Sequence, residues 1–141
     1  MCRYNVGTRE FNQLGKDIDG KAADGYSGES VSLSADGNIV AIGAVDNSEN
    51  GDRSGHVRLY KYNDSNDDGE FNKLGSDING DKADDMFGHS LLLSLDEYYE
   101  AIGGPTRPDS NSGSGYVRVF RYDDNGQFFQ HGPDIDGDAL C

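Results

Sequence analysis

The chain has few of the features that mark membrane proteins, nucleic-acid-binding proteins or zinc proteins. It contains no Trp, three Pro, two Met and two Cys in 141 residues, and its longest apolar stretch is the seven residues 39–45. A membrane-spanning helix needs about 20 apolar residues, so no membrane insertion is expected. Lys and Arg number 12 against 26 Asp and Glu, giving a formal charge of -14. Such a charge repels phosphate backbones, so nucleic acid is not an expected partner.

The two cysteines, Cys2 and Cys141, lie near the two ends of the chain. This spacing fits no zinc or redox motif, because those motifs need close pairs. The two thiols either form a disulfide, if the ends meet in an oxidising compartment, or are unrelated. Residues 1–7 lack the apolar core of a secretory signal, so the sequence as given begins without one.

What the chain does contain is an internal repeat of 60 residues. Residues 11–64 aligned without gaps on residues 71–124 give 23 identities in 54 positions, where ordinary composition would give roughly four. A third copy starts at Phe128, and residues 3–5 match residues 61–63. The repeat predicts two whole units at residues 11–70 and 71–127, the end of a preceding unit at residues 1–10 and the start of a third at residues 128–141.

Each unit is predicted to form four short antiparallel strands. In the first unit these are residues 11–14, 29–34, 39–42 and 55–62, where apolar residues alternate with polar ones or form short buried runs. Asp36-Gly37 is typical of a tight hairpin turn, whereas the second unit has Glu97 in place of Gly37, which specifies its hairpin less well. No apolar pattern of helical spacing persists for about 11 residues, so the fold class is all-β.

Four antiparallel strands repeated at this interval are typical of a β-propeller blade. The units resemble the FG-GAP repeats of the propeller in integrin α subunits, and in particular a non-integrin subgroup of large secreted or surface proteins. The residues that carry the resemblance, which covers nearly the whole chain, are Met86-Phe87-Gly88, Tyr26-Ser27-Gly28, Ile42-Gly43-Ala44-Val45 and Ile102-Gly103-Gly104-Pro105. The resemblance implies two complete blades plus partial ones, an adhesive role and a place outside the cell or on its surface.

A propeller closes with about four to eight blades, so two blades leave faces that other blades must cover. Either several copies of the chain form a ring, or the chain is an excerpt of a longer propeller, which the partial units at both ends favour. Further blades, from the same or a longer chain, are therefore expected partners.

Clusters of Asp and Asn make calcium the candidate cofactor, because hard cations take oxygen ligands. One predicted set is Asp77, Asn79, Asp81 and Asp84, and its counterpart in the first unit is Asp17, Asp19 and Asp24. The following Gly falls at the fourth position of the motif and not at the sixth, as a standard calcium loop requires. The alternative is that these carboxylates cap turns and keep the surface soluble.

Catalysis is not expected, because no nucleophile motif or phosphate loop occurs and the three histidines fall at non-equivalent positions of the repeat. Binding is expected at two loops that differ between units while the strands around them match. The candidate ligand-binding residues are Asp46, Asn47, Asn50, Asp52, Arg53, Arg107, Asp109 and Asn111. Three functions stay open: loops that bind a protein or glycan, a ring-forming lectin with sugar pockets between blades, and an acidic spacer without a ligand. The aromatic positions Tyr60, Tyr62, Phe120 and Tyr122 favour packing over sugar stacking.

Overall fold

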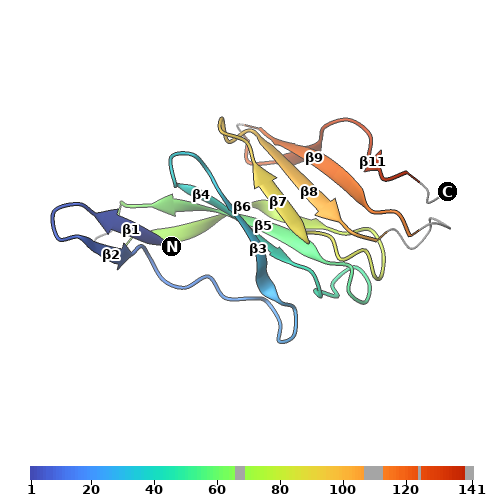
Figure 1. The fold of residues 1–141 in the computed structure, drawn as a ribbon, viewed down its shortest axis with the longest axis horizontal. Helices are drawn as coiled ribbons and strands as arrows, with labels where there is room; N and C mark the ends of the chain where they lie inside the picture. Colours follow the sequence, from blue (N-terminus) through green and yellow to red (C-terminus); the bar gives the residue numbers. More distant parts are fainter. Residues whose placement is uncertain (66–68, 107–112, 124, 139–141) are drawn as a thin grey trace.

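The structure is a computed structural model that describes residues 1–65, 69–106, 113–123 and 125–138. Within these residues the chain forms eleven strands and no helix, arranged in three antiparallel sheets of two, four and five strands (Figure 1). The all-β prediction is confirmed. In the described part of the chain, no helix has the length and hydrophobicity that crossing a membrane would require.

The three sheets follow one another along the chain. The N-terminal hairpin pairs β1 (Cys2–Asn5) with β2 (Glu10–Gln13). The first sheet has the order β3 (Ser27–Leu33), β4 (Ile39–Ala44), β5 (His56–Asn63) and β6 (Glu70–Asn79). The second sheet has the order β7 (Ser90–Leu93), β8 (Tyr99–Gly104), β9 (Tyr116–Tyr122) and β10 (Phe128–Gln130), and β11 (Ile135–Asp136) also pairs with β9.

The sheets are out of phase with the sequence repeat. Residues 11–14 were expected to open the sheet of the first unit, but β2 pairs with β1, and the first sheet takes β6, from the second unit, as its outer strand. A short turn joins each such strand to the one before it, which favours pairing with that neighbour. The same aromatic pair sits across the two strands in all three sheets, with ring centroids 5.1 Å apart for Tyr4–Phe11, 5.3 Å for Tyr62–Phe71 and 5.0 Å for Tyr122–Phe128.

A single core lies between the first and second sheets. β7 packs against β3 and β4, and β10 lies near β6, so equivalent strands of the two sheets meet. The first sheet contributes Ile39, Ala41, Val57, Leu59 and Ile78, and the second unit contributes Phe87, Leu93, Ile102 and Tyr116. Phe87 is fully buried and stacks on Tyr116 with centroids 6.0 Å apart. One face of each sheet is therefore covered by the other sheet.

The N-terminal hairpin stands apart from this core. β1 and β2 contact no other strand of the described chain, and they lie at the opposite end of the molecule from β11 (Figure 1). Cys2 is an exposed free cysteine. Its candidate disulfide partner, Cys141, lies outside the described residues.

The two β-hairpin turns of the larger sheets share one geometry despite their different sequences. In the first sheet, Asp36 accepts hydrogen bonds from the Ser34 hydroxyl (2.7 Å) and the Asn38 N–H (2.8 Å), and Gly37 adopts a φ of 75°. In the second sheet, Asp96 plays the same part and Glu97 adopts a φ of 67°. The second turn thus forms as the first does, with a non-glycine residue in the left-handed region.

Candidate functional site

One end of the two larger sheets gathers four connections, which we call the loop rim. Because consecutive strands run antiparallel, their connections alternate between the two ends. The loop rim contains residues 14–26, 45–55 and 80–89, which join β2 to β3, β4 to β5 and β6 to β7. It also contains residues 105–106 and 113–115, the described parts of the connection between β8 and β9. The first loop predicted to bind a ligand and the described ends of the second are at this end. The predicted residues Arg107, Asp109 and Asn111 lie outside the described part of the chain.

The first of these loops is held in place by the connection that follows β6. Asn50 Nδ2 donates a hydrogen bond to the Gly80 carbonyl at 2.7 Å, and the Met86 N–H donates to the Arg53 carbonyl at 3.0 Å. The Asp84 N–H donates to the carbonyl of Asp52 at 2.8 Å. The loop is therefore a strap between the sheets, and Asn50, Asp52 and Arg53 stay exposed on it.

Two of the predicted ligand-binding residues serve the loop itself. Asn47 is 5% exposed, and its side-chain oxygen accepts a hydrogen bond from the Glu49 N–H at 3.0 Å. Asp46 pairs with Arg53, with Nε and Oδ1 3.4 Å apart. Asn47 is thus a buried structural residue and not part of a ligand-facing surface.

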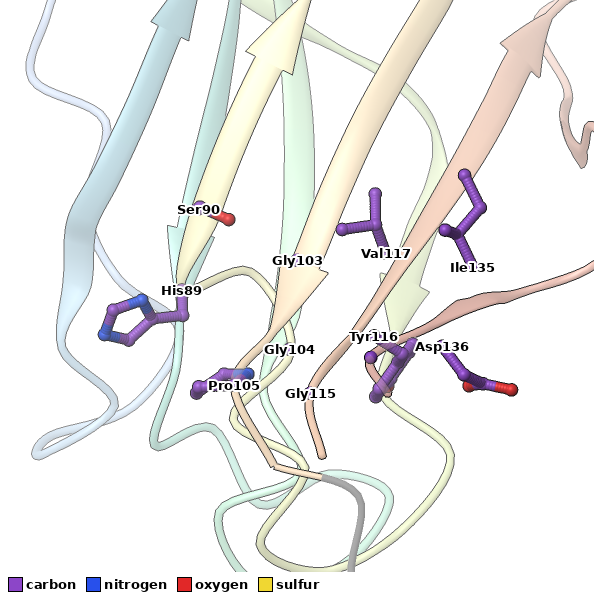
Figure 2. Close-up of a pocket in the computed structure, with 11 residues that line it drawn as sticks. His89, Ser90, Gly103, Gly104, Pro105, Gly115, Tyr116, Val117, Ile135 and Asp136 are labelled. Atoms are coloured by element: carbon purple, nitrogen blue, oxygen red, sulfur yellow. The ribbon is translucent and has the colours of Figure 1, made fainter. Parts of the chain in front are cut away.

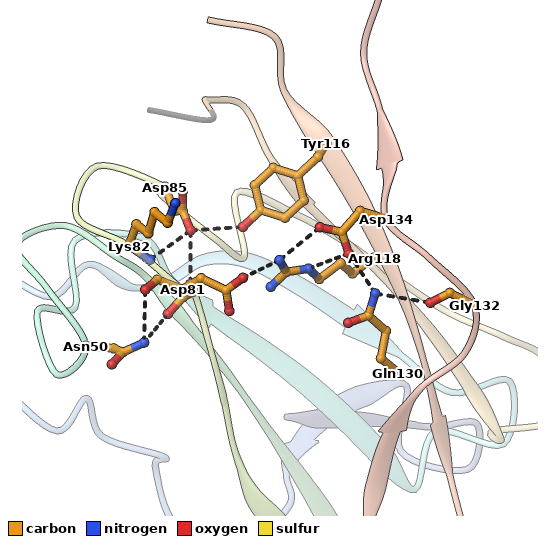
Figure 3. A network of polar contacts seen from close by, with 10 residues as sticks. Asn50, Asp81, Lys82, Asp85, Tyr116, Arg118, Gln130, Gly132 and Asp134 are labelled. Atoms are coloured by element: carbon orange, nitrogen blue, oxygen red, sulfur yellow. Dashed lines mark hydrogen bonds and ion pairs between the residues drawn. The ribbon is translucent and has the colours of Figure 1, made fainter. Parts of the chain in front are cut away.

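Below the loop rim, Arg118 joins three segments of the second sheet and its connections. Its Nε and Nη2 each donate to a different oxygen of Asp134, both at 2.9 Å, and Nη2 also pairs with Asp81 (Figure 3). The guanidinium carbon lies 4.9 Å from the centroid of the Tyr116 ring. Burial alone would lower the pKa of Arg118, but its hydrogen bonds to Asp134 and Asp81 raise the pKa by more. The network fixes the ends of β9 and β11 against the 80–89 connection.

The carboxylate of Asp85 organises that connection. It is 3% exposed and accepts hydrogen bonds from the N–H groups of Asp81 (3.0 Å) and Lys82 (3.1 Å) and from the Tyr116 hydroxyl (3.2 Å). Burial and the neighbouring Asp85 raise the pKa of Tyr116, so this phenol stays protonated and donates. This arrangement stiffens the loop rim beneath its exposed side chains.

The first sheet has an arginine and an aspartate at the equivalent positions, but their charged neighbours differ. Arg58, the counterpart of Arg118, donates from Nη2 to the Asp19 carbonyl at 3.1 Å. Asp77, the counterpart of Asp134, pairs with Lys73 and with Lys21, whose Nζ is 2.6 Å from Oδ2. Burial alone would raise the pKa of Asp77, but hydrogen bonds from Lys21 and Lys73 outweigh it and lower the pKa. Lys21 stands where the second unit has Asp81, so the sign of the charge at this position is reversed.

His56 lies beside these charges. Its ligand atoms and those of Glu49 and Asp77 form the one group, among the described residues, in which three such side chains lie within 4.8 Å of one another. His56 is 1% exposed, and burial lowers its pKa, so the imidazole is neutral. The Lys21 ammonium already pairs with both carboxylates, at 2.8 Å from Glu49 and 2.6 Å from Asp77. In the described structure, the positive charge beside these two carboxylates is therefore the Lys21 ammonium.

The structure distributes the residues of the predicted calcium sets among different partners. In the second unit, Asp77 meets two lysines, Asp81 meets Arg118, and Asp84 Oδ1 lies 3.5 Å from Arg53 Nη1. In the first unit, Asp17 accepts a hydrogen bond from Gln13 at 2.8 Å. Of the carboxylates in both sets, only Asp77 belongs to the group of three described above. Calcium binding stays an untested prediction and has no part in the proposed function.

The aromatic positions pack as the sequence favoured. Tyr60 is 9% exposed, and Phe120 contacts Phe87 edge to face with centroids 6.3 Å apart. Tyr62 and Tyr122 each pair with a phenylalanine on the neighbouring strand, as described above. All four side chains therefore lie against neighbouring groups, and only Tyr60 among them is buried.

A pocket of about 430 Å³ opens on the outer face of the second sheet, next to the loop rim (Figure 2). Its lining includes Gly103, Gly115 and Gly137 together with the side chains of Val117 and Ile135. None of the residues that line this pocket was among those predicted to bind a ligand or calcium. The signal that could have found it is the recurrence of glycine at equivalent positions of successive units.

Comparisons with known proteins do not assign the chain to a family. No protein-family model matches it, and no curated protein matches it at a significant level. The proposals that follow therefore rest on the geometry of the chain and on its sequence pattern.

Proposed function

We propose that the chain is a non-catalytic segment of a β-propeller that binds a protein or a glycan through its loop rim. The observation that carries the proposal is the contrast between the rim and the groups beneath it. Asn50, Asp52 and Arg53 are exposed on a loop that differs between the two units, while the backbone of that loop is hydrogen-bonded to the 80–89 connection. A stiff scaffold that presents variable polar side chains is how binding surfaces are commonly built.

The stacking of the two sheets supports the propeller part of the proposal. Equivalent strands of the first and second sheets meet, β3 with β7 and β6 with β10. The second sheet therefore lies on the first as a copy of it, with the strands in the same order and shifted in position. Repetition of this displacement by further sheets is what closes a propeller. The sequence resemblance to FG-GAP repeats points the same way.

The charged groups below the rim favour binding over catalysis. Asp77 faces two lysines, and Arg118 is shared by two carboxylates. The imidazole of His56, whose chemistry would suit a general base, is 1% exposed and so is shielded from a substrate. Asp77 and Arg118 thus serve as internal ties, and the exposed loop side chains are left to contact a ligand.

Binding can be tested with purified protein on a glycan array and against a library of purified secreted and cell-surface ectodomains. For each ligand detected, the double variant Asp52→Ala/Arg53→Ala is compared with Lys61→Ala/Glu70→Ala. Both pairs remove one acidic and one basic exposed side chain, and the second pair lies at the opposite end of the sheets. We expect the first pair to weaken binding at least ~10-fold and the second to leave it unchanged. Equal effects of the two pairs, or no binding to any probe, would contradict the proposal.

A further inference from the structure

Inside the molecule, the segment 84–88 fits into a glycine-lined groove of the first sheet. We call this segment the plug of the second unit. A Cβ atom at Gly43 would collide with the Gly88 carbonyl, and one at Gly55 would collide with the Phe87 backbone. A Cβ at Gly80 would come within 2.9 Å of the Phe87 Cβ. The plug therefore leaves no room for a side chain at Gly43 or Gly55, and at Gly80 the Ser54 carbonyl and the plug together leave none.

Hydrogen bonds fix the plug in the groove. The Ser30 hydroxyl donates to the Gly88 carbonyl, and the Phe87 N–H donates to the Ser54 carbonyl at 3.0 Å. The groove walls, Val57 and Ile78, are 0% and 7% exposed. The plug thus covers both the polar and the apolar parts of the groove.

The second sheet carries a copy of this groove, which is the pocket of Figure 2 and which we call the socket. Six of its eleven lining residues are identical to their counterparts in the first sheet, and the other five differ. The identical pairs are Gly43/Gly103, Gly55/Gly115, Gly80/Gly137, Ser30/Ser90, Val57/Val117 and Ile78/Ile135. In the socket, a Cβ at each of the three glycines would meet only atoms of the second sheet and its own connections. Ile135 is 60% exposed and Val117 is 37% exposed, so the surface that the plug covers in the first sheet is bare in the second.

The first unit carries a copy of the plug, residues 24–28. Its φ values match those of the plug of the second unit at three positions: 61° and 62° at Asp24 and Asp84, 47° at both Tyr26 and Met86, and 97° and 92° at Gly28 and Gly88. The two segments are not identical, because β3 already begins at Ser27 whereas β7 begins only at Ser90. A Cβ at Gly28 would meet nothing within 4 Å, whereas one at Gly88 would lie 2.9 Å from Val57. The plug of the first unit therefore already has the left-handed residues of the bound plug, while the Gly28 face that would enter a groove is open.

Strand β3, which begins at Ser27 within the first plug, is exposed on the same face. Val31 and Leu33 of β3 are 64% and 50% exposed, whereas Leu93, the counterpart of Leu33, is 7% exposed in the core. The chain thus exposes copies of both surfaces that form the internal contact: the socket on the second sheet, and the first plug with β3 on the first sheet.

We infer that the socket of one molecule takes the plug and β3 of a second copy of this chain, in a head-to-tail contact that repeats the internal packing of the two sheets. A second copy is the occupant that the structure specifies, because each half of the contact is already present on the chain in the geometry of the internal interface. Such a contact is heterologous and extends to a ring or a filament. Ser27 replaces Phe87 in the first plug, so the contact between molecules is less filled than the internal one. The inference does not depend on the ligand of the loop rim.

The first test is the mass of the chain in solution, measured by sedimentation equilibrium up to ~1 mM protein at ~0.15 M salt. We expect the mass to rise with concentration from the 15.3 kDa of one chain to multiples of it. Ile135→Lys in the socket and Val31→Lys beside the plug should each weaken association more than ~100-fold, because each would bury an unpaired charge. Leu95→Lys is the matched control, since Leu95 is 84% exposed in the turn at the other end of β7. It should associate as the unchanged chain does.

The second test mixes the two variants that fail to associate alone. Val31→Lys retains an intact socket and Ile135→Lys retains an intact plug, so an equimolar mixture should form a complex of one molecule of each. Thermal melting of each variant shows that it is folded. A mass of 15.3 kDa for the unchanged chain at every concentration would overturn the inference and leave the socket to another partner. Dissociation of Leu95→Lys, or a mixture that stays monomeric, would overturn it as well.

Discussion

Glu100 is a buried acid that makes the stability of this protein depend on pH. It lies on β8, is 2% exposed, and neither carboxyl oxygen has a hydrogen-bond partner in the described structure. It shares a small internal space with Ile39, Leu93 and Phe120. Burial in these surroundings raises the pKa of Glu100 from 4.5 to about 8. The equivalent residue of the first sheet is Val40.

The size and sign of the effect follow from these two pKa values. Between pH 4.5 and about 8, Glu100 keeps its proton in the folded state and loses it in the unfolded state. The unfolding free energy therefore falls as the pH rises through this range and levels off above it. Each pKa unit corresponds to about 1.4 kcal/mol, so the full penalty is about 5 kcal/mol, of which about 4 kcal/mol develops between pH 5 and pH 8.5.

The replacement Glu100→Val copies the residue of the first sheet and removes the penalty. Urea unfolding at pH 5 and at pH 8.5 should show the variant to be more stable at both, with its advantage about 4 kcal/mol larger at the higher pH. Glu100→Gln should lose the pH dependence but keep part of the cost of an unpaired polar group. Glu70→Val, at an exposed glutamate, is the matched control. If the advantage of Glu100→Val were the same at the two pH values, Glu100 would not be the buried neutral acid described here.

Two further substitutions test the interactions that hold the sheets. Arg118→Lys replaces a forked donor by a single ammonium beside Asp134 and should destabilise the protein by about 2 kcal/mol in urea unfolding. Arg58→Lys should cost about 1 kcal/mol or less, because Arg58 pairs with no carboxylate among the described residues. Equal costs for the two replacements would contradict the role given to the forked pair. Glu97→Gly relieves a left-handed φ of 67° in the turn between β7 and β8. The replacement should raise the unfolding free energy by about 1 kcal/mol, which corresponds to a rise of about 3 °C in melting temperature. A lower melting temperature would show that the turn is not strained.

The strands and turns were largely predictable because their signals are local. Alternation of apolar and polar residues, a buried run at residues 39–42 and the Asp36-Gly37 turn placed β3, β4 and β5 to within a few residues. The phase of the sheets was not predictable in the same way. A repeat has no intrinsic starting point, so its sequence cannot show whether residues 11–14 open one sheet or close the one before it.

Residue patterning alone specifies an all-β chain built from two copies of one unit, because period-two alternation and turn residues act between near neighbours. Which charges meet depends on how the sheets and connections pack. Stacking of the two sheets and folding of the connections bring Lys21 to Asp77, Asp81 to Arg118 and the 84–88 plug into its groove. These partners are distant in the sequence, and they meet only because the sheets stack and the connections fold. The plug of the second unit fills the groove of the first sheet in this way, and the groove of the second sheet stays open to solvent.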